Sequence, residues 1–282
     1  MLRRFFLLCM ISFIAIIEHS GAVFGADPLD GGRIESSHCK GDGSEVGQLF
    51  QKADALYASF KPREALKELL KILQSDPGSH EALAKISRVY IDIGDMVPES
   101  TPDWQEKRLE HYHVAEDYAR KAVEADPNGT WGHFYVAVSL GKIALESSIP
   151  RQIDLAQEIR TEVKKAIALD PQNGYAYHVY GVWHRRMAEI GQMSRIFVST
   201  ILWRSVPKGK LKKSVQYLKK AISLNPTVIS SHLELAKTYV AMGKWQLARS
   251  SLRSVQGLPV QYSDDPLKKR EAQQLLQEIK NR

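Results

Sequence analysis

The sequence predicts an all-α fold, a tetratricopeptide-like helical-repeat superhelix (an α-solenoid) with inserted loops and helices. The first observation is a recurring phrase, an apolar helix with small residues that ends at Asp-Pro or Asn-Pro, with prolines at positions 77, 127, 171 and 226. Proline lacks a backbone N–H and pushes its predecessor out of the helical region, so each phrase ends a helix. The second observation is that an apolar stretch with helical spacing follows each turn. Units of this kind stack on one another to bury their apolar faces.

The stretch 214–255 shows the pattern most clearly. Ala221 and Asn225-Pro226 end one helix, and Ala236 and Tyr239 follow at the spacing of a tetratricopeptide unit of about 34 residues. Small residues at helical spacing let two helices approach closely, so we expect Ala221 and Ala236 to be buried at helix crossings. The four prolines are 50, 44 and 55 residues apart. Loops or extra turns are therefore inserted within the units.

The N-terminal 44 residues are predicted to lie outside the repeats. Residues 1–26 combine Arg3-Arg4, an apolar run of 13 residues from position 5 to 17, and small residues, which is the layout of a secretory signal peptide. The run is short of the roughly 20 residues that a bilayer span needs. We expect an exported protein, periplasmic or secreted, and the alternative is an uncleaved N-terminal segment that anchors the chain to the membrane. Residues 27–44 are rich in Gly, Ser and Asp, which predicts a flexible linker.

The remainder of the chain is predicted to form one elongated domain. Helical apolar spacing begins at Glu45 and continues through five units to position 262, so residues 45–262 are assigned to the repeat array. Residues 263–282 are strongly charged and have the polar outer face of a C-terminal capping helix.

No pattern in the sequence indicates an enzyme. It contains no phosphate-binding glycine loop, no G-x-S-x-G elbow and no H-E-x-x-H metal motif. His111 and His113 are two residues apart, so on a helix they point to different faces. Cys9 lies in the predicted signal peptide, and Cys39 has no partner for a disulfide or a zinc site. The sequence therefore predicts no catalytic residue, no cofactor and no metal.

The second half of the array resembles the regulator of microtubule dynamics family. Four phrases carry the resemblance, a G-x-W phrase, an (A)E motif, the start of an arginine- and apolar-rich insertion, and a closing (D/N)P: Gly181-Val182-Trp183, Ala188-Glu189, Arg195-Ile196 and Asn225-Pro226. The resemblance extends from about His80 to Leu276. It implies a non-enzymatic tetratricopeptide-like protein, in a family with some animal members linked to microtubules and others to contacts between mitochondria and endoplasmic reticulum. A cytosolic microtubule-associated protein is therefore one alternative.

Charge is distributed unevenly along the chain. The net charge is +7 at pH 7, but from Gly181 to Arg282 there are 19 Lys and Arg against 6 Asp and Glu. Ten of the basic residues lie between Arg185 and Lys220, with Glu189 as the single acid. Such density favours an anionic partner, either an acidic protein segment or a lipid surface, although a solvated helix face is the plainer explanation. Nucleic acid is the least favoured partner, because no nucleic-acid module is recognisable.

The phase of the repeat predicts which residues face a concave groove. If Ala236 is the eighth position of its unit, nine aromatic or basic residues fall on that face: Arg88, Trp131, Phe134, Lys142, Tyr175, His178, Arg185, Arg186 and Lys237. Aromatic rings beside cations suit the capture of an acidic segment or a C-terminal peptide. The alternative is that Trp131 and Phe134 pack against an insertion. We therefore predict a non-enzymatic scaffold for protein–protein interaction.

The 193–213 insertion is the second candidate surface. Met193, Ile196, Phe197 and Ile201 recur at helical spacing, so one face is mostly apolar and must be buried. It packs either on its own superhelix or on a membrane, where the chain would act as a peripheral tether. The candidate membrane contacts are Phe197, Trp203, Arg204, Lys208, Lys210, Lys212 and Lys213.

Overall fold

The computed structural model describes residues 44–190 and 206–282. Within these residues it contains eleven α-helices and no strand, which confirms the all-α prediction. The helices are α2 (Glu45–Ala58), α3 (Pro62–Ser75), α4 (His80–Asp95), α5 (Trp104–Ala125), α6 (Thr130–Leu145), α7 (Ile149–Leu169), α8 (Gly174–Glu189), α10 (Leu211–Leu224), α11 (Ile229–Ala241), α12 (Trp245–Gly257) and α13 (Asp265–Glu278). The signal-peptide, anchor and linker predictions concern residues outside this range and remain predictions.

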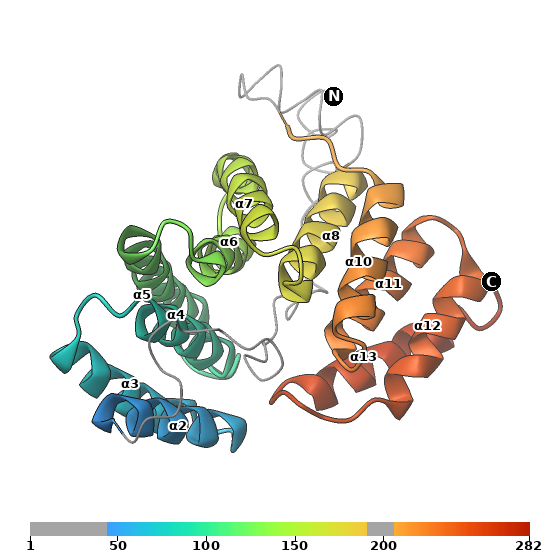
Figure 1. The fold of residues 1–282 in the computed structure, drawn as a ribbon. Coiled ribbons are helices and arrows are strands. Elements are labelled where there is room, and N and C mark those ends of the chain that lie inside the picture. Colours follow the sequence, from blue (N-terminus) through green and yellow to red (C-terminus); the bar gives the residue numbers. More distant parts are fainter. Residues whose placement is uncertain (1–43, 191–205) are drawn as a thin grey trace.

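The helices form antiparallel pairs that follow one another around an arc (Figure 1). The pairs are α2–α3, α4–α5, α6–α7, α8–α10 and α11–α12, and α13 packs on α11 and α12 at the C-terminal end. Successive first helices also touch, as α4 touches α6 and α8 touches α11. The first helices therefore make an inner layer and the second helices an outer layer, which is the arrangement of a tetratricopeptide-like solenoid.

The Asp-Pro turns between units share one local geometry. Asp76, Asp126 and Asp170 each donate their backbone N–H to the carbonyl four residues earlier and so end the helix. In each, Oδ1 accepts a hydrogen bond from the backbone N–H two residues further on, at distances of 3.1, 3.0 and 2.8 Å. Such a local side-chain bond mimics a backbone turn, and proline then prevents the helix from continuing. The chain therefore reverses at the same point in each unit.

Small residues set the distance between neighbouring helices, both within a unit and between units. A Cβ added to Gly181 of α8 would lie 2.6 Å from Leu218 Cγ of α10. Likewise, a Cβ at Gly132 of α6 would lie 2.9 Å from Val123 Cγ2 of α5. Ala221 and Ala236 are fully buried, as the repeat phase predicts. No larger side chain fits at these crossings without moving a helix.

The apolar cores of the N-terminal and central units are connected. Trp183 lies in the central cluster of buried residues, and its Nε1 donates a 2.8 Å hydrogen bond to the Ala156 carbonyl of the preceding unit. Leu73, Tyr90 and Tyr118 contact both this cluster and the N-terminal one. The units consequently stabilise one another rather than folding independently. No helix of residues 44–190 and 206–282 is long and apolar enough to cross a bilayer.

Enlarging a crossing residue tests the repeat phase. Ala236→Leu places three extra carbon atoms at a fully buried position, which we expect to lower the free energy of unfolding by about 1–3 kcal/mol. Ala241→Leu, on an exposed position of the same helix, is the matched control and should leave stability within about 0.5 kcal/mol. Urea unfolding of both variants measures the difference, and equal midpoints would show that the phase is wrong.

Candidate protein-binding surface

The nine residues predicted for the groove lie on the inner helices α4, α6, α8 and α11. The structure divides them into an aromatic group, two separate cations and a charged cluster on α8 and α11. The aromatic group is Trp131, Phe134 and Tyr175, with ring centroids 5.6 Å apart for Trp131–Phe134 and 6.2 Å apart for Trp131–Tyr175. Phe134 is buried, whereas the other two rings are half-buried. The sequence therefore grouped residues that are in contact across two units.

Arg88 and Lys142 are the two separate cations, and both are buried. The Arg88 guanidinium lies 3.3 Å from the centre of the Tyr57 ring. Lys142 Nζ donates to both carboxylate oxygens of Asp95, at 2.7 and 2.6 Å, and Tyr112 Oη donates to the same carboxylate at 2.7 Å. The charge of Lys142 is thus neutralised inside the protein.

Asp92 lies one helical turn from Arg88 on α4, and the pKa of its carboxyl is raised. It accepts a hydrogen bond from Tyr57 Oη. Burial raises the pKa of the Asp92 carboxyl to about 7, although the Tyr57 hydrogen bond and the Arg88 charge act in the opposite direction. The charges of Asp95 and of Asp264, at the start of α13, also raise this pKa. Stability in this region depends on the protonation of one carboxyl group.

Glu234 is the centre of the charged cluster. It is only 2% exposed, and it accepts a hydrogen bond from Arg185 Nη2 and a 2.9 Å bond from Lys237 Nζ. Arg185 also donates to Glu189 at 2.9 Å, and Lys237 Nζ lies 2.7 Å from Glu271 of α13. Despite its burial, Glu234 has a pKa held well below the usual range by these cations. The cluster joins α8, α11 and α13.

His178 is buried next to this cluster. Its Nδ1 lies 3.0 Å from Ser231 Oγ, in the next unit. Burial lowers its pKa to about 4, although the charge of Glu234 acts in the opposite direction. At neutral pH the imidazole is therefore uncharged and serves as a hydrogen-bonding group between α8 and α11.

Arg186 differs from its neighbour Arg185. Its side chain is half-buried, and its Nε and Nη2 atoms are shielded from water without a hydrogen-bond partner among the described residues. Burial lowers the pKa of this guanidinium, and the charge of Arg185 lowers it further. Shielded guanidinium nitrogens without partners are costly in the free protein. Arg186 is also more exposed than Arg88 and Arg185, which are buried, and is therefore the predicted groove arginine most accessible to a carboxylate.

The sequence analysis missed the acidic partners of the groove cations. Asp95 and Glu234 neutralise three of the predicted cations, Lys142, Arg185 and Lys237. The spacing of Glu234 and Lys237, three residues apart on one helix, was a signal for one of these pairs. The others join distant segments and leave no local signature. The inner face is therefore a charged but largely self-neutralised surface.

The candidate membrane contacts fall partly outside the described residues. Phe197, Trp203 and Arg204 belong to residues 191–205, of which the structure gives no description. Lys208, Lys210, Lys212 and Lys213 are exposed at the start of α10. The tether remains a prediction. Elsewhere, the described part of the chain contains no group of three or more His, Cys, Asp or Glu that could hold a metal ion.

The stacked pairs of inner and outer helices define a tetratricopeptide-like helical-repeat protein. A solved structure of a thermophilic tetratricopeptide protein from Thermus thermophilus superimposes with a TM-score of 0.60, covers 80% of this chain and 98% of its own, and is 16% identical. The model for regulator of microtubule dynamics proteins 1-3 matches residues 49–280. The chain belongs to this family, as the motifs around Trp183 indicated.

Individual relatives are distant. Regulator of microtubule dynamics protein 1 of Mus musculus is 27% identical over 234 residues, which cover 83% of this chain and 74% of the relative. Protein 3 of Xenopus laevis is 26% identical over 220 residues, and these make up only 46% of its length. The similarity extends over the repeat array.

The pKa of Asp92 predicts a measurable pH dependence. Its carboxyl holds a proton more tightly in the folded state, so wild-type stability is lost as pH rises from about 4 to about 7. Asp92→Asn cannot ionise. Its free energy of unfolding relative to wild type should therefore increase by about 3–4 kcal/mol between pH 4 and pH 8. Urea titrations of both proteins across this range measure the difference, in which all shared titrating groups cancel. A difference that does not change with pH would contradict the assignment.

Proposed function

We propose that this protein is a non-enzymatic scaffold that binds a protein partner on the inner face of its repeat array, and that the partner offers a carboxylate from an acidic segment or a C-terminus. The fold supports a protein-binding role, because stacked helix pairs present an extended concave surface without a catalytic centre of their own. The family names of the relatives support a regulatory rather than a catalytic role.

The under-coordinated guanidinium of Arg186 carries this proposal. The buried cations Lys142 and Arg185 are already paired with internal carboxylates, so they stabilise the inner face rather than recruit a ligand. Arg186 has two shielded nitrogen atoms without a partner among the described residues. A guanidinium binds a carboxylate through two parallel hydrogen bonds, and the gain is large where water is excluded.

The aromatic group supplies the apolar part of the proposed site. Trp131 and Tyr175 are half-buried, so part of each ring is accessible to a partner. The buried Phe134 ring packs against both. Tyr175 and Arg186 share helix α8 and are joined by the same rigid backbone. A peptide that lies along α8 would reach the rings with an apolar side chain and Arg186 with its carboxylate.

Replacing Arg186 separates recognition from folding. Arg186→Gln should weaken binding of acidic and free-carboxylate peptides by at least about tenfold, the cost of a charged hydrogen bond. Its thermal unfolding should be unchanged or improved, because a cation with shielded, unsatisfied nitrogens is removed. Peptide arrays that display acidic segments and free C-termini, followed by calorimetry with the purified chain, provide the measurement. Arg253→Gln, on the exposed face of α12, is the control and should bind as wild type does.

Arg185→Gln is the structural counterpart. This change leaves Glu234 buried with one cation fewer, which we expect to cost about 3–5 kcal/mol of stability. If Arg186→Gln instead destabilises the array to the same extent while every bound peptide keeps its affinity, Arg186 belongs to the framework and the proposal fails.

Microtubule association is the second candidate, favoured by family membership. It requires that residues 1–26 do not export the chain, which N-terminal sequencing of the mature protein from fractionated cells decides. We expect the purified chain to pellet with polymerised microtubules and not with actin filaments, an acidic polymer of a different kind. Equal pelleting with both polymers would indicate general attraction to negative charge and would count against a specific role.

A further inference from the structure

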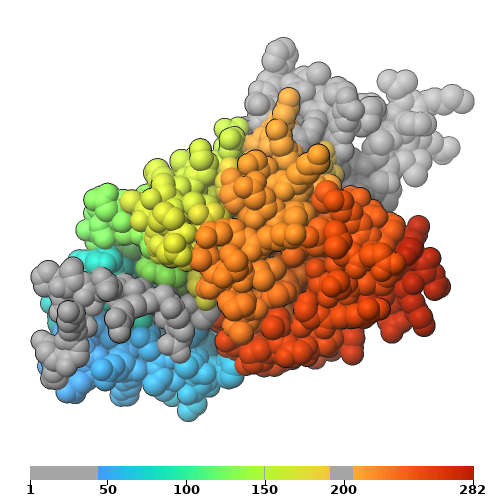
Figure 2. Space-filling model, turned by 45° about the vertical axis from the view of Figure 1, so that its right-hand side comes forward, coloured from blue at the N-terminus to red at the C-terminus, as the bar shows by residue number. Residues whose placement is uncertain are grey.

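A second charged surface lies on the outer side of the array, around helices α7, α8 and α10. Five exposed cations define it, and we call it the outer basic surface: Arg160, Lys164, Lys208, Lys210 and Lys213. Two come from α7, two from the segment between α8 and α10, and one from α10. Figure 2 shows the helices of this region, from yellow to orange, side by side on one face of the molecule. The sequence analysis had placed three of these lysines in a membrane contact and had not included α7.

These cations lack the internal partners that the inner cations have. Among the described residues, no carboxylate lies within ion-pair distance of any of the five. Lys213 Nζ instead donates to Gln216 Oε1 at 3.1 Å and lies 5.8 Å from the centre of the Tyr217 ring. Lys142 and Arg185 differ from these five cations because their charges are neutralised by carboxylates within the fold. The five outer cations have no carboxylate partner within residues 44–190 and 206–282.

Close packing of residue 209 on α8 brings the cations of three segments near one another. Gly209 lies directly against α8, since a Cβ there would be 2.2 Å from the His184 carbonyl oxygen and 2.6 Å from the Ala188 nitrogen. This close approach holds Lys208 and Lys210 beside α8. Burial lowers the pKa of His184 to about 4, and the charges of Arg160, Lys213 and Lys210 lower it further. Three elements therefore bring their cations to the neighbourhood of one buried ring.

Aromatic rings form the base of this surface. The Tyr217 ring stacks on His184 with centroids 5.4 Å apart and an angle of 9° between the planes. Tyr217 also contacts Tyr177, at 6.2 Å, and the Arg160 guanidinium lies 5.6 Å from the Trp183 ring. Cations above ring faces are fixed in position without being neutralised. They remain available to an anion.

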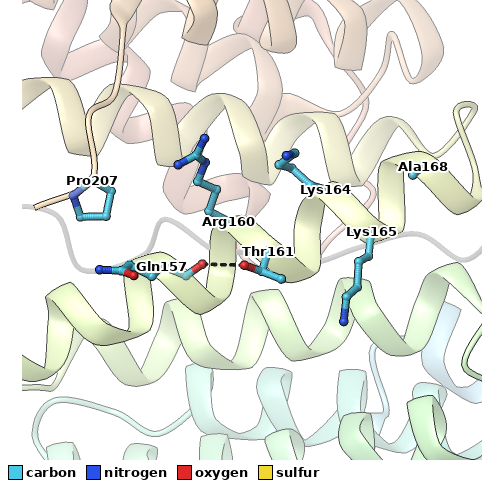
Figure 3. Close-up of a pocket in the computed structure, with 7 residues that line it drawn as sticks. All are labelled: Gln157, Arg160, Thr161, Lys164, Lys165, Ala168 and Pro207. Carbon is cyan, nitrogen blue, oxygen red and sulfur yellow. Dashed lines mark hydrogen bonds between the residues drawn. The ribbon is translucent and has the colours of Figure 1, made fainter. Parts of the chain in front are cut away.

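A hollow lies along the α7 side of the surface (Figure 3). Its volume is about 620 Å³, within the roughly 300–1,000 Å³ of ligand sites. Figure 3 shows that Arg160 and Lys164 point to the same side of α7, while Lys165 points away, and that Pro207 lies near Gln157. Lys165 pairs with Glu162 at 3.0 Å. None of the residues that line the hollow is acidic.

We propose that the outer basic surface binds a run of glutamate or aspartate side chains in a protein partner, independently of the inner-face site. An extended acidic peptide matches two sets of exposed cations, one on α7 in the lining of the hollow and one in residues 208–213, which follow directly after the lining residue Pro207. A bilayer matches less well, because it cannot enter a hollow. No large, strongly exposed apolar side chain lies in residues 206–224 to insert into lipid.

Binding of a hexaglutamate peptide tests this proposal. Fluorescein-labelled hexaglutamate is titrated with the full-length chain, and anisotropy is followed in low salt and at about 0.15 M salt, since screening weakens exposed charge pairs. Arg160→Glu with Lys164→Glu should weaken binding by at least about tenfold. Lys208→Glu with Lys210→Glu, in the second set of cations, should do the same. All four side chains are exposed, so circular dichroism and thermal unfolding should match wild type.

The matched control changes the same charges elsewhere. Arg63→Glu with Lys67→Glu replaces an exposed Arg and Lys four residues apart on α3, as at 160 and 164 on α7, and should bind within about twofold of wild type. The proposal is overturned if this control loses as much affinity, because net charge alone would then explain binding. It is also overturned if wild type binds phosphatidylserine vesicles but not hexaglutamate. Loss of binding in Arg186→Gln, with binding retained in the α7 variant, would assign the peptide to the inner face instead.

Discussion

The close approach of neighbouring helices at glycine and alanine is the constraint on which the rest of the structure depends. Gly181 admits Leu218, and Gly132 admits Val123, at distances that leave no space for another carbon atom. Because the helices are so close, the inner helices α4, α6, α8 and α11 each lie between an outer helix of their own unit and one of the unit before it. Nearly every side chain of α6 from Gly132 to Ile143 is therefore buried, whatever its polarity.

Charged residues on the inner helices must consequently find partners within the protein. Lys142 and Arg185 would be strongly destabilising if unpaired, since a buried charge without a counter-charge costs several kcal/mol. Asp95 and Glu234 supply the counter-charges, and the pairs connect one unit to the next. This network fixes the relative position of the units at the same time as it removes most of the positive charge from the inner face. Arg186 lies outside this network, because its Nε and Nη2 atoms have no hydrogen-bond partner among the described residues.

The two faces of the array therefore differ in what they offer a partner. The inner face combines half-buried rings with the guanidinium of Arg186, an arrangement that we propose suits a defined carboxylate in a defined pose. The outer basic surface combines several exposed cations, an arrangement that attracts acidic segments at longer range and depends on salt. We propose that the inner face binds one partner by shape and that the outer basic surface attracts another, or a second part of the same partner, by charge.

The sequence by itself determined the fold, because the signals for it are local. The Asp-Pro turns, the apolar spacing and the alanines at positions 221 and 236 each act within a few residues, and the family motifs lie around Trp183. Repeat phase also placed Trp131, Phe134 and Tyr175 together, since equivalent positions in successive units face the same side. Only the tertiary structure decided which charges remain available. Glu234 neutralises Arg185 from 49 residues away, and Asp95 neutralises Lys142 from 47 residues away. Pairing over such separations depends on how the units stack, which no short-range pattern records.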